Sequence, residues 1–169
     1  MSNLDDALAE FMIAESHRRS SLVEELAEVA DERVVSLFLE ILRDTAEEDF
    51  VRVEVLKSLP FRQHTPTTRE QFAHALVAIL AQPEEDTLVR QFAAIAARRF
   101  VDEPGVALFL EELVCNAQED LDVRHNALSS LERNSTNKEC RECLQRIVNV
   151  PDFASSATRA LQRTKTAES

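Results

Sequence analysis

Two cysteines, Cys140 and Cys143, have the Cys-x-x-Cys spacing that is typical of zinc sites and of redox-active dithiols. A structural zinc ion needs four ligands, and Cys115 and His125 are the nearest candidates to complete the set. The spacing also places both cysteines on the apolar stripe of a helix with Leu144, and free cysteine is a common small core residue. We therefore predict that the pair is structural and that the protein binds no metal ion or other cofactor.

The four histidines, at positions 17, 64, 74 and 125, form no recognisable catalytic or metal-binding pattern. None has a glutamate directly after it or a second histidine four residues away. A Ser-His-Asp triad is assembled from distant positions, so spacing alone does not reveal one. The chain thus offers no motif for catalysis, and we predict that it is not an enzyme.

Glycine occurs once, at Gly105. Phosphate-binding loops, dinucleotide fingerprints and nucleophile elbows all need glycines where the backbone turns sharply or approaches a ligand closely. An all-β fold is disfavoured as well, because hairpins consume glycine and proline and the chain has only five prolines. These exclusions favour a helical fold.

The net charge of the chain restricts the classes of partner that it can bind. With 31 acidic and 19 basic residues, the formal net charge is −12. Binding to nucleic acids and to anionic membranes depends on positive charge, so we expect neither partner. A basic protein would be attracted electrostatically. The alternative is that the charge only maintains solubility.

The elements that must position these residues repeat along the chain. Three segments contain Val-Arg followed by small or aliphatic residues at helical spacing, with the arginines at positions 52, 90 and 124. Weaker copies include Arg19 and Ala154, as expected for terminal repeats, which face solvent on one side. Counted from Arg19, the successive offsets are 33, 38, 34 and 30 residues. A second set of amphipathic segments lies between these copies.

The two sets of segments predict five antiparallel helix pairs, and hence an all-α solenoid. Residues 1–163 would form this single domain, and residues 164–169 a flexible C-terminal tail. Thr67 and Thr136 are expected to cap the fifth and ninth helices. The predicted helices are 4–15, 17–29, 32–44, 48–59, 68–81, 86–100, 104–116, 120–133, 137–149 and 151–163.

An aspartate precedes each of the three central arginines, at positions 49, 86 and 122. Antiparallel helix pairs with Asp and Val-Arg near the start of the second helix resemble HEAT repeats. The resemblance covers roughly residues 17–163. It implies a scaffold with an extended concave surface formed by the second helices. The His-Glu iron-binding motifs of HEAT-like hydroxylases are missing from the sequence.

Side chains one, two, five and nine positions after each arginine should face outward on the second helices. They are polar in the first and fourth repeats but partly apolar in the second and third. An exposed apolar patch with a polar rim is typical of a protein-binding site, although a neighbouring segment could instead bury it. The loop at positions 60–66 lies beside this patch and is either a recognition element or a tolerated insertion. We predict partner contacts by Val53, Phe61, Arg62, His64, Phe92, Ile95, Arg99, His125 and Arg133.

Acidic runs recur between the two helices of a pair, and two interpretations stay open. They would form an exposed acidic ridge along one edge of the solenoid, or they would stabilise helix N-termini while their aspartates pair with the repeated arginines. The ridge would comprise Glu47, Glu48, Glu84, Glu85, Glu119 and Asp120.

Together these patterns predict a non-enzymatic protein-binding scaffold, adaptor or inhibitor, for example an immunity protein against a basic toxin. The alternatives are a HEAT-like nucleic-acid-acting protein of the DNA glycosylase type and a chromophore lyase subunit. The sequence shows no signal-peptide pattern, no apolar stretch of membrane-spanning length and no disulfide framework, so we expect a cytoplasmic protein.

Overall fold

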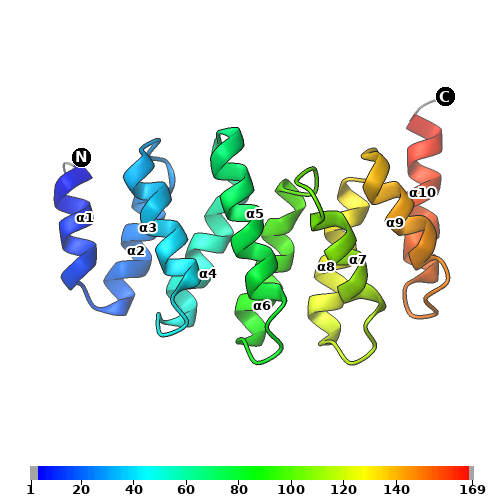
Figure 1. The fold of residues 1–169 in the computed structure, drawn as a ribbon, viewed down its shortest axis with the longest axis horizontal. Coiled ribbons are helices and arrows are strands. Elements are labelled where there is room, and N and C mark those ends of the chain that lie inside the picture. The colour runs from blue at the N-terminus through cyan, green and yellow to red at the C-terminus, as the bar shows by residue number, and fades with distance from the viewer. Residues whose placement is uncertain (1–3, 168–169) are drawn as a thin grey trace.

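In the computed structural model of this chain, the described residues form ten α-helices in five pairs. The structure describes the backbone of residues 4–167 and the side chains of residues 4–163, and this part of the chain contains no β-strand. The helices follow one another along the long axis, so the two ends of the chain lie at opposite ends of the molecule (Figure 1). The chain is therefore an α-solenoid, as predicted. Within residues 4–167, no helix is long and apolar enough to cross a membrane.

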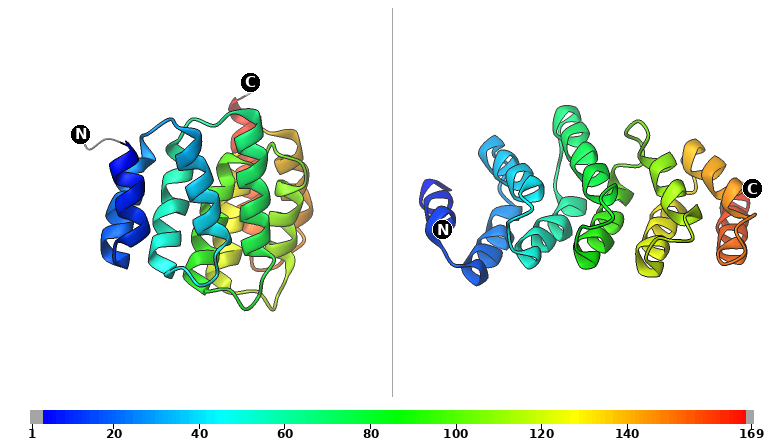
Figure 2. Two further views of the ribbon diagram at one scale, coloured as in Figure 1. Left: turned by 60° about the vertical axis from the view of Figure 1, so that its left-hand side comes forward. Right: turned by 60° about the horizontal axis from the view of Figure 1, so that its bottom comes forward.

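The helices form two layers (Figure 2). One layer holds the first helix of each pair, namely α1 (Leu4–Ile13), α3 (Glu32–Arg43), α5 (Pro66–Leu80), α7 (Val106–Cys115) and α9 (Lys138–Ile147). The other holds the second helices, namely α2 (Ser16–Ala27), α4 (Asp49–Ser58), α6 (Thr87–Ala96), α8 (Leu121–Arg133) and α10 (Ala154–Ala167). Short 3-10 turns, η1 (Leu59–Phe61) and η2 (Ala97–Arg99), extend α4 and α6. Helices α2, α4, α6 and α8 pack side by side along the second layer.

The core lies between the two layers. The valines that precede the repeated arginines, Val51, Val89 and Val123, are fully buried in one continuous apolar cluster. Phe72 and Leu110 of the first helices belong to the same cluster. Burial of each such side chain stabilises the fold by roughly 1.5–3 kcal/mol, so the apolar stripes that define the repeat also hold the two layers together.

Several predicted helix ends are wrong in detail. Helix α5 begins at Pro66 and is capped by Thr65 rather than Thr67, because proline fits the first helical position, where no backbone donor is needed. Helix α9 is capped by Asn137 rather than Thr136, and the Asn137 side chain accepts two backbone hydrogen bonds.

The last predicted helix, 151–163, is also displaced, since α10 begins at Ala154 and continues to Ala167. The backbone of residues 164–167, which the prediction assigned to the tail, is helical. Residues 168 and 169 of the predicted tail lie outside the described residues.

An arginine of each of the first four repeats pairs with an acidic residue of the next repeat, and three of these four arginines are buried. Arg52 donates to both carboxylate oxygens of Glu85, at 2.8 and 2.7 Å, although their side chains are only 1% and 6% exposed. Arg90 donates to both oxygens of Glu119 at 2.6 Å. Two-bond pairing between arginine and carboxylate is stronger and more directional than a single ion pair. We name this series of ion pairs the arginine ladder. Its members are Arg19–Glu47, Arg52–Glu85, Arg90–Glu119 and Arg124–Asp152.

The same arginines also hold their own helix pair together. Arg90 Nη2 donates to the carbonyl of Leu80 at 2.9 Å, and Arg124 Nε donates to the carbonyl of Val114 at 3.0 Å. Both carbonyls lie in the last turn of a first helix, where four carbonyl groups have no partner within the helix. Each arginine thus satisfies the end of one helix while its guanidinium reaches the next repeat.

The glutamates are fixed as firmly as the arginines. Glu85 Oε1 accepts from the backbone N–H of Asp86 at 2.9 Å, and Glu119 Oε1 accepts from that of Asp120 at 2.9 Å. Hydrogen bonding to Arg52 lowers the pKa of Glu85 below its ordinary value. Both carboxylates are therefore held in place at the start of a second helix, and that of Glu85 is kept ionised.

The predicted acidic ridge is wrong for Glu47, Glu85 and Glu119, whose side chains are buried in these ion pairs. Glu48, Glu84 and Asp120 are exposed, and Asp120 also caps α8. The other interpretation, in which the aspartates of the acidic runs pair with the repeated arginines, is nearer to the structure. The acidic partners of the arginines differ from those predicted. The close partner of each arginine is an acidic residue of the following repeat, whereas Asp49 lies 3.8 Å from Arg52.

Removing one member of a buried pair should destabilise the fold strongly. Arg90→Met would leave the Glu119 carboxylate buried without its counterion, which costs about 3–5 kcal/mol of unfolding free energy. The double variant Arg90→Met/Glu119→Met removes both charges and should recover most of that loss. Urea unfolding at neutral pH measures both variants. A single variant that loses less than about 1 kcal/mol would show that the ladder does not hold the repeats together.

Candidate binding surface

The second helices present a regular outer surface, which we name the second-helix face. Because α2, α4, α6 and α8 pack side by side, side chains at equivalent positions form rows across this face. The positions two, five and nine residues after each central arginine are all at least partly exposed. In chain order they are Glu54, Lys57, Phe61, then Phe92, Ile95, Arg99, and then Asn126, Ser129, Arg133.

The apolar centre of this face is smaller than the sequence suggested. Phe92 and Ile95 are partly exposed on α6, and Phe92 also packs against the core. The predicted partner contact at Val53 is wrong, because its side chain is 6% exposed. Val53 belongs to the buried cluster, whereas His125, at the same position on α8, is exposed.

Phe61 is the most prominent apolar side chain on the face, with 79% of it exposed. It lies in the 3-10 turn that follows α4 and borders a groove of about 230 Å³ between α2 and α4. The groove is lined by Glu24, Ala27, Glu28, Glu54, Lys57, Ser58, Phe61 and Arg62. Three of these side chains are acidic and two are basic, and the exposed ring of Phe61 lies at the edge.

The prediction that Arg62 contacts a partner is wrong. Its guanidinium donates to the carbonyls of Leu26 and Val29, both at 3.0 Å, and to that of Ala27. It also lies 5.0 Å above the ring of Phe38. These carbonyls belong to the C-terminal end of α2, which carries unpaired acceptors and partial negative charge. Arg62 thus caps α2 from the next repeat.

His64 is partly exposed, and its ring is held in place by the loop and the core. Its Nε2 donates to the carbonyl of Leu59 at 2.9 Å, and its ring packs against Phe72 and Phe100 at 5.3 Å from each. The Nδ1 atom is buried and has no hydrogen-bond partner within the described part of the chain. Hydrogen bonds at Leu59 and Arg62 therefore hold the loop in place on both sides of Pro60 and Phe61.

Arg99, His125 and Arg133 are exposed and continue the face toward the C-terminal end. The ring of His125 meets the buried ring of Phe153 edge to face at 5.0 Å. This contact places His125 where α8 approaches the start of α10.

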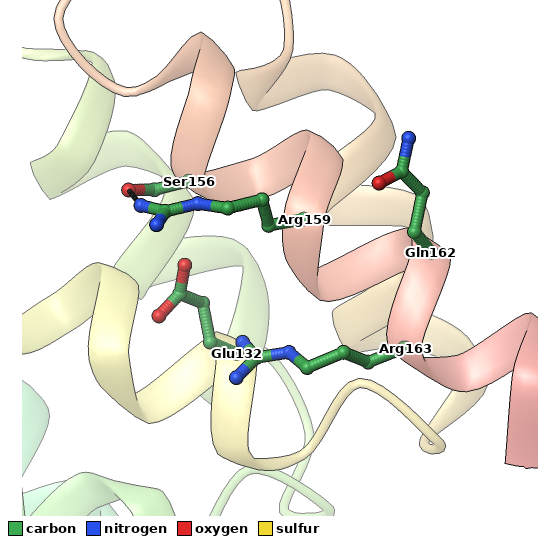
Figure 3. A pocket seen from close by; sticks show the side chains of 5 residues that line it. All are labelled: Glu132, Ser156, Arg159, Gln162 and Arg163. Atoms are coloured by element: carbon green, nitrogen blue, oxygen red, sulfur yellow. Dashed lines mark hydrogen bonds between the residues drawn. The ribbon is translucent and has the colours of Figure 1, made fainter.

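A second groove, which the sequence did not reveal, lies between α8 and α10. It has a volume of about 480 Å³ and is lined by Glu132, Ser156, Arg159, Gln162 and Arg163 (Figure 3). Arg159 donates to Ser156 Oγ at 3.1 Å. The sequence signal that could have pointed to this groove is the composition of α10, which contains no acidic residue in a chain of net charge −12.

The cysteines are core residues, as predicted from their apolar stripe. Cys140 and Cys143 are buried, and Cys143 Sγ donates to the carbonyl of Ala107 at 3.6 Å. Burial raises the pKa of both thiols to about 12, so they are protonated at neutral pH. Cys115 is exposed at the end of α7. Among the residues that the structure describes, no group of three or more His, Cys, Asp or Glu side chains is arranged to hold a metal ion.

Comparisons with known proteins do not assign a family. No family model and no curated protein sequence matches the chain. Among solved structures, human deoxyhypusine hydroxylase in complex with glycerol is 13% identical, over 90% of this chain and 82% of its own, with a TM-score of 0.44. A likeness at this level carries no conclusion about function, and the HEAT family stays a prediction.

His64 should make the protein less stable in mildly acidic solution. Burial, helped by Arg62, Arg69 and Arg99, lowers the pKa of His64 in the folded state. The unfolded chain takes up the proton near pH 6.5, so it binds more protons than the folded protein below that pH. The free energy of unfolding should therefore fall as the pH drops from about 7 to about 5.

The variant His64→Phe should remove this part of the pH dependence, since phenylalanine keeps the ring packing and does not titrate. Melting temperatures measured from about pH 5 to 7.5 test the difference, with His74→Phe on the exposed side of α5 as the matched control. If both variants show the same pH dependence as the unaltered protein, His64 does not contribute to it.

Proposed function

We propose that this chain is a non-enzymatic scaffold that binds a partner protein on its second-helix face. The exposure of Phe61 is the observation that carries the proposal. Its ring is 79% exposed, although the neighbouring residues Arg62 and His64 are held by hydrogen bonds. Aromatic side chains dominate the energy of many protein interfaces. A large exposed ring at a well-defined position is the kind of anchor that such interfaces use.

The rigidity of the loop supports this role. Arg62 is bound to three carbonyls of α2, and His64 is bound to Leu59 and packed between two rings. Pro60 restricts the backbone directly before Phe61. Binding loses less conformational entropy when the contact residue is already held in place. Phe61 would therefore enter a partner's pocket without ordering the loop first.

The groove beside Phe61 indicates the chemistry of the partner at this end of the face. Glu24 of α2, Glu28 directly after α2 and Glu54 of α4 line it, and Lys57 pairs with Glu54 at 2.7 Å. A segment that places apolar and basic side chains here would meet complementary charge, which raises the association rate and selects the partner. An inhibitor of a basic protein is one form of this scaffold.

The size of the face is sufficient for a stable complex. Neighbouring helices pack roughly 10 Å apart, so the five second helices span about 40 Å. A typical interface buries about 800 Å² on each partner. Ile95 and the exposed part of Phe92 lie on the helix next to Phe61 and would extend the contact along the solenoid.

Substitution of Phe61 should weaken binding without unfolding the protein. The partner is recovered by pull-down from the native host, identified by mass spectrometry and titrated by calorimetry. Phe61→Asp should weaken its binding by about 2 kcal/mol or more, roughly 30-fold, with little change in melting temperature because the ring is exposed. Ile95→Asp should act in the same direction.

Phe50→Asp is the matched control, since Phe50 is also an exposed phenylalanine of α4 but lies in its first turn, away from the groove. It should bind normally. Phe92→Asp is less informative, because Phe92 packs partly on the core and its loss should lower stability as well. If Phe61→Asp and Ile95→Asp both bind like Phe50→Asp, the partner does not use this face.

A further inference from the structure

Exposed apolar side chains gather at one edge of the solenoid, where the two helices of each pair are joined and which lies at the bottom of Figure 1. We name it the turn edge, and it comprises the turns and the helix ends that border them, the turns being 14–15, 44–48, 81–86, 116–120 and 148–153. Seven large apolar side chains of the described residues are exposed. Phe61 and Leu108 lie elsewhere, and the five at the turn edge are Met12, Ile13, Phe50, Leu88 and Leu121.

Three of these side chains form a row across the central repeats. Phe50 and Leu88 are the second residues of α4 and α6, and Leu121 is the first residue of α8. These helices pack side by side, roughly 10 Å apart, so the row is about 20 Å long. Single exposed apolar residues are common on protein surfaces, whereas a group that recurs in neighbouring repeats is typical of a binding site.

The turn edge is also negatively charged. Its five turns contain ten acidic residues and no basic residue, and Arg43, directly before the second turn, is the one basic residue that adjoins them. Four of the ten acidic residues belong to the arginine ladder. The other six are exposed, namely Glu15, Asp44, Glu48, Glu84, Asp86 and Asp120.

Acidic side chains of neighbouring repeats lie close together along this edge. Desolvation and the negative charge of Asp86, in the turn before α6, raise the pKa of Asp49, in the first turn of α4. Arg52 acts in the opposite direction, but its guanidinium is already bound to both oxygens of Glu85. The negative charge of the turn edge is therefore only partly balanced within the chain, and a cation from outside would be attracted.

Helix stabilisation explains part of this surface. Asp86 and Asp120 cap α6 and α8 by accepting backbone hydrogen bonds, and acidic residues at a helix N-terminus interact favourably with the helix dipole. The apolar row has no such role, because a cap needs a polar oxygen and an apolar side chain gains nothing from the dipole. A partner that covers Phe50, Leu88 and Leu121 would remove their apolar surface from water.

We propose that the turn edge binds a basic amphipathic helix of a second protein, at a site separate from the second-helix face. The apolar stripe of that helix would cover Phe50, Leu88 and Leu121, and its lysine and arginine side chains would reach the exposed carboxylates of the turns. A helix rises about 1.5 Å per residue, so about 14 residues span the row. Apolar burial provides the affinity, and the charge selects basic ligands.

Other occupants of the turn edge fit less well. Nucleic acids and anionic membranes carry negative charge and would be repelled by the carboxylates. A second copy that docked edge to edge would place carboxylates against carboxylates. The second-helix face lies apart from this site, since Phe50 and Phe61 are at opposite ends of α4 and η1, roughly 16 Å apart along the helix axis.

A model peptide tests the proposal without knowledge of the partner. The probe is a fluorescein-labelled amphipathic helix of about 14 residues, with leucine on one face and lysine on the other, titrated by fluorescence polarisation. The unaltered protein should bind it, and Leu88→Ser/Leu121→Ser should weaken binding about tenfold or more. Leu108→Ser is the matched control, because Leu108 is 45% and Leu88 47% exposed, but Leu108 lies in the first turn of α7, away from the turn edge. The control should change binding by less than about twofold.

The charge of the edge is tested by a second pair of variants. Glu48→Gln/Glu84→Gln removes two carboxylates of the turn edge and should weaken binding about threefold at low salt, with a smaller loss at high salt because ions screen exposed charges. Glu32→Gln/Glu70→Gln makes the same change of net charge at exposed residues of α3 and α5 outside the edge, and it should have less effect. A peptide with glutamate in place of lysine should not bind.

Four results would overturn the proposal. The first two are no binding by the unaltered protein and equal losses for Leu88→Ser/Leu121→Ser and Leu108→Ser. The third is binding of the glutamate peptide as tight as that of the lysine peptide. The fourth is self-association of the unaltered protein that Leu88→Ser/Leu121→Ser abolishes, which would assign the edge to a second copy. Melting temperatures of all variants show whether each is folded.

Variants at the two ends of α4 separate this site from the function proposed above. Phe50→Asp should weaken binding of the peptide and keep the partner of the second-helix face, whereas Phe61→Asp should do the reverse. If Phe61→Asp releases the peptide and Leu88→Ser/Leu121→Ser retains it, the peptide binds the α2–α4 groove. The turn edge is then not a binding site, while the scaffold function is unaffected.

Discussion

The arrangement of the repeats depends most on the ion pairs that the buried arginines of α4, α6 and α8 form with the following repeat. A guanidinium taken out of water is tolerated only when nearly all of its donors are satisfied and its charge is balanced. In Arg90, Nη1 and Nη2 bind a carbonyl of α5 and both oxygens of Glu119, whereas the buried Nε has no hydrogen-bond partner within the described residues. These partners come from two different repeats, so the position of one repeat on the next is restricted by hydrogen-bond geometry as well as by apolar packing.

The ladder also determines which charges reach the surface. Three carboxylates of the inter-helix turns are buried in ion pairs with arginine, namely Glu47, Glu85 and Glu119. The edge of the solenoid formed by these turns is therefore less acidic than the composition suggests. The second-helix face is instead divided along its length, with glutamates around the α2–α4 groove and arginines around the α8–α10 groove. Such a division gives the face a direction, and charge complementarity of this kind favours specificity.

The sequence by itself determined the helices and their pairing. The apolar period of 3.6 residues is a local property, and it placed all ten helices within a few residues of their observed ends. The recurrence of Val-Arg identified which helices are equivalent. It also identified the outward positions on α6, because the side of a helix on which Phe92 and Ile95 lie follows from their spacing to Arg90.

Only the tertiary structure decided what each side chain meets across repeats. Arg52 pairs with Glu85, 33 residues away, and Arg62 caps α2 from 36 residues away. The burial of Val53 and the groove between α8 and α10 likewise depend on how one repeat lies against the next. Helical periodicity specifies the direction of a side chain relative to its own helix axis, whereas its partners depend on the distance and angle between helices, which no local pattern records.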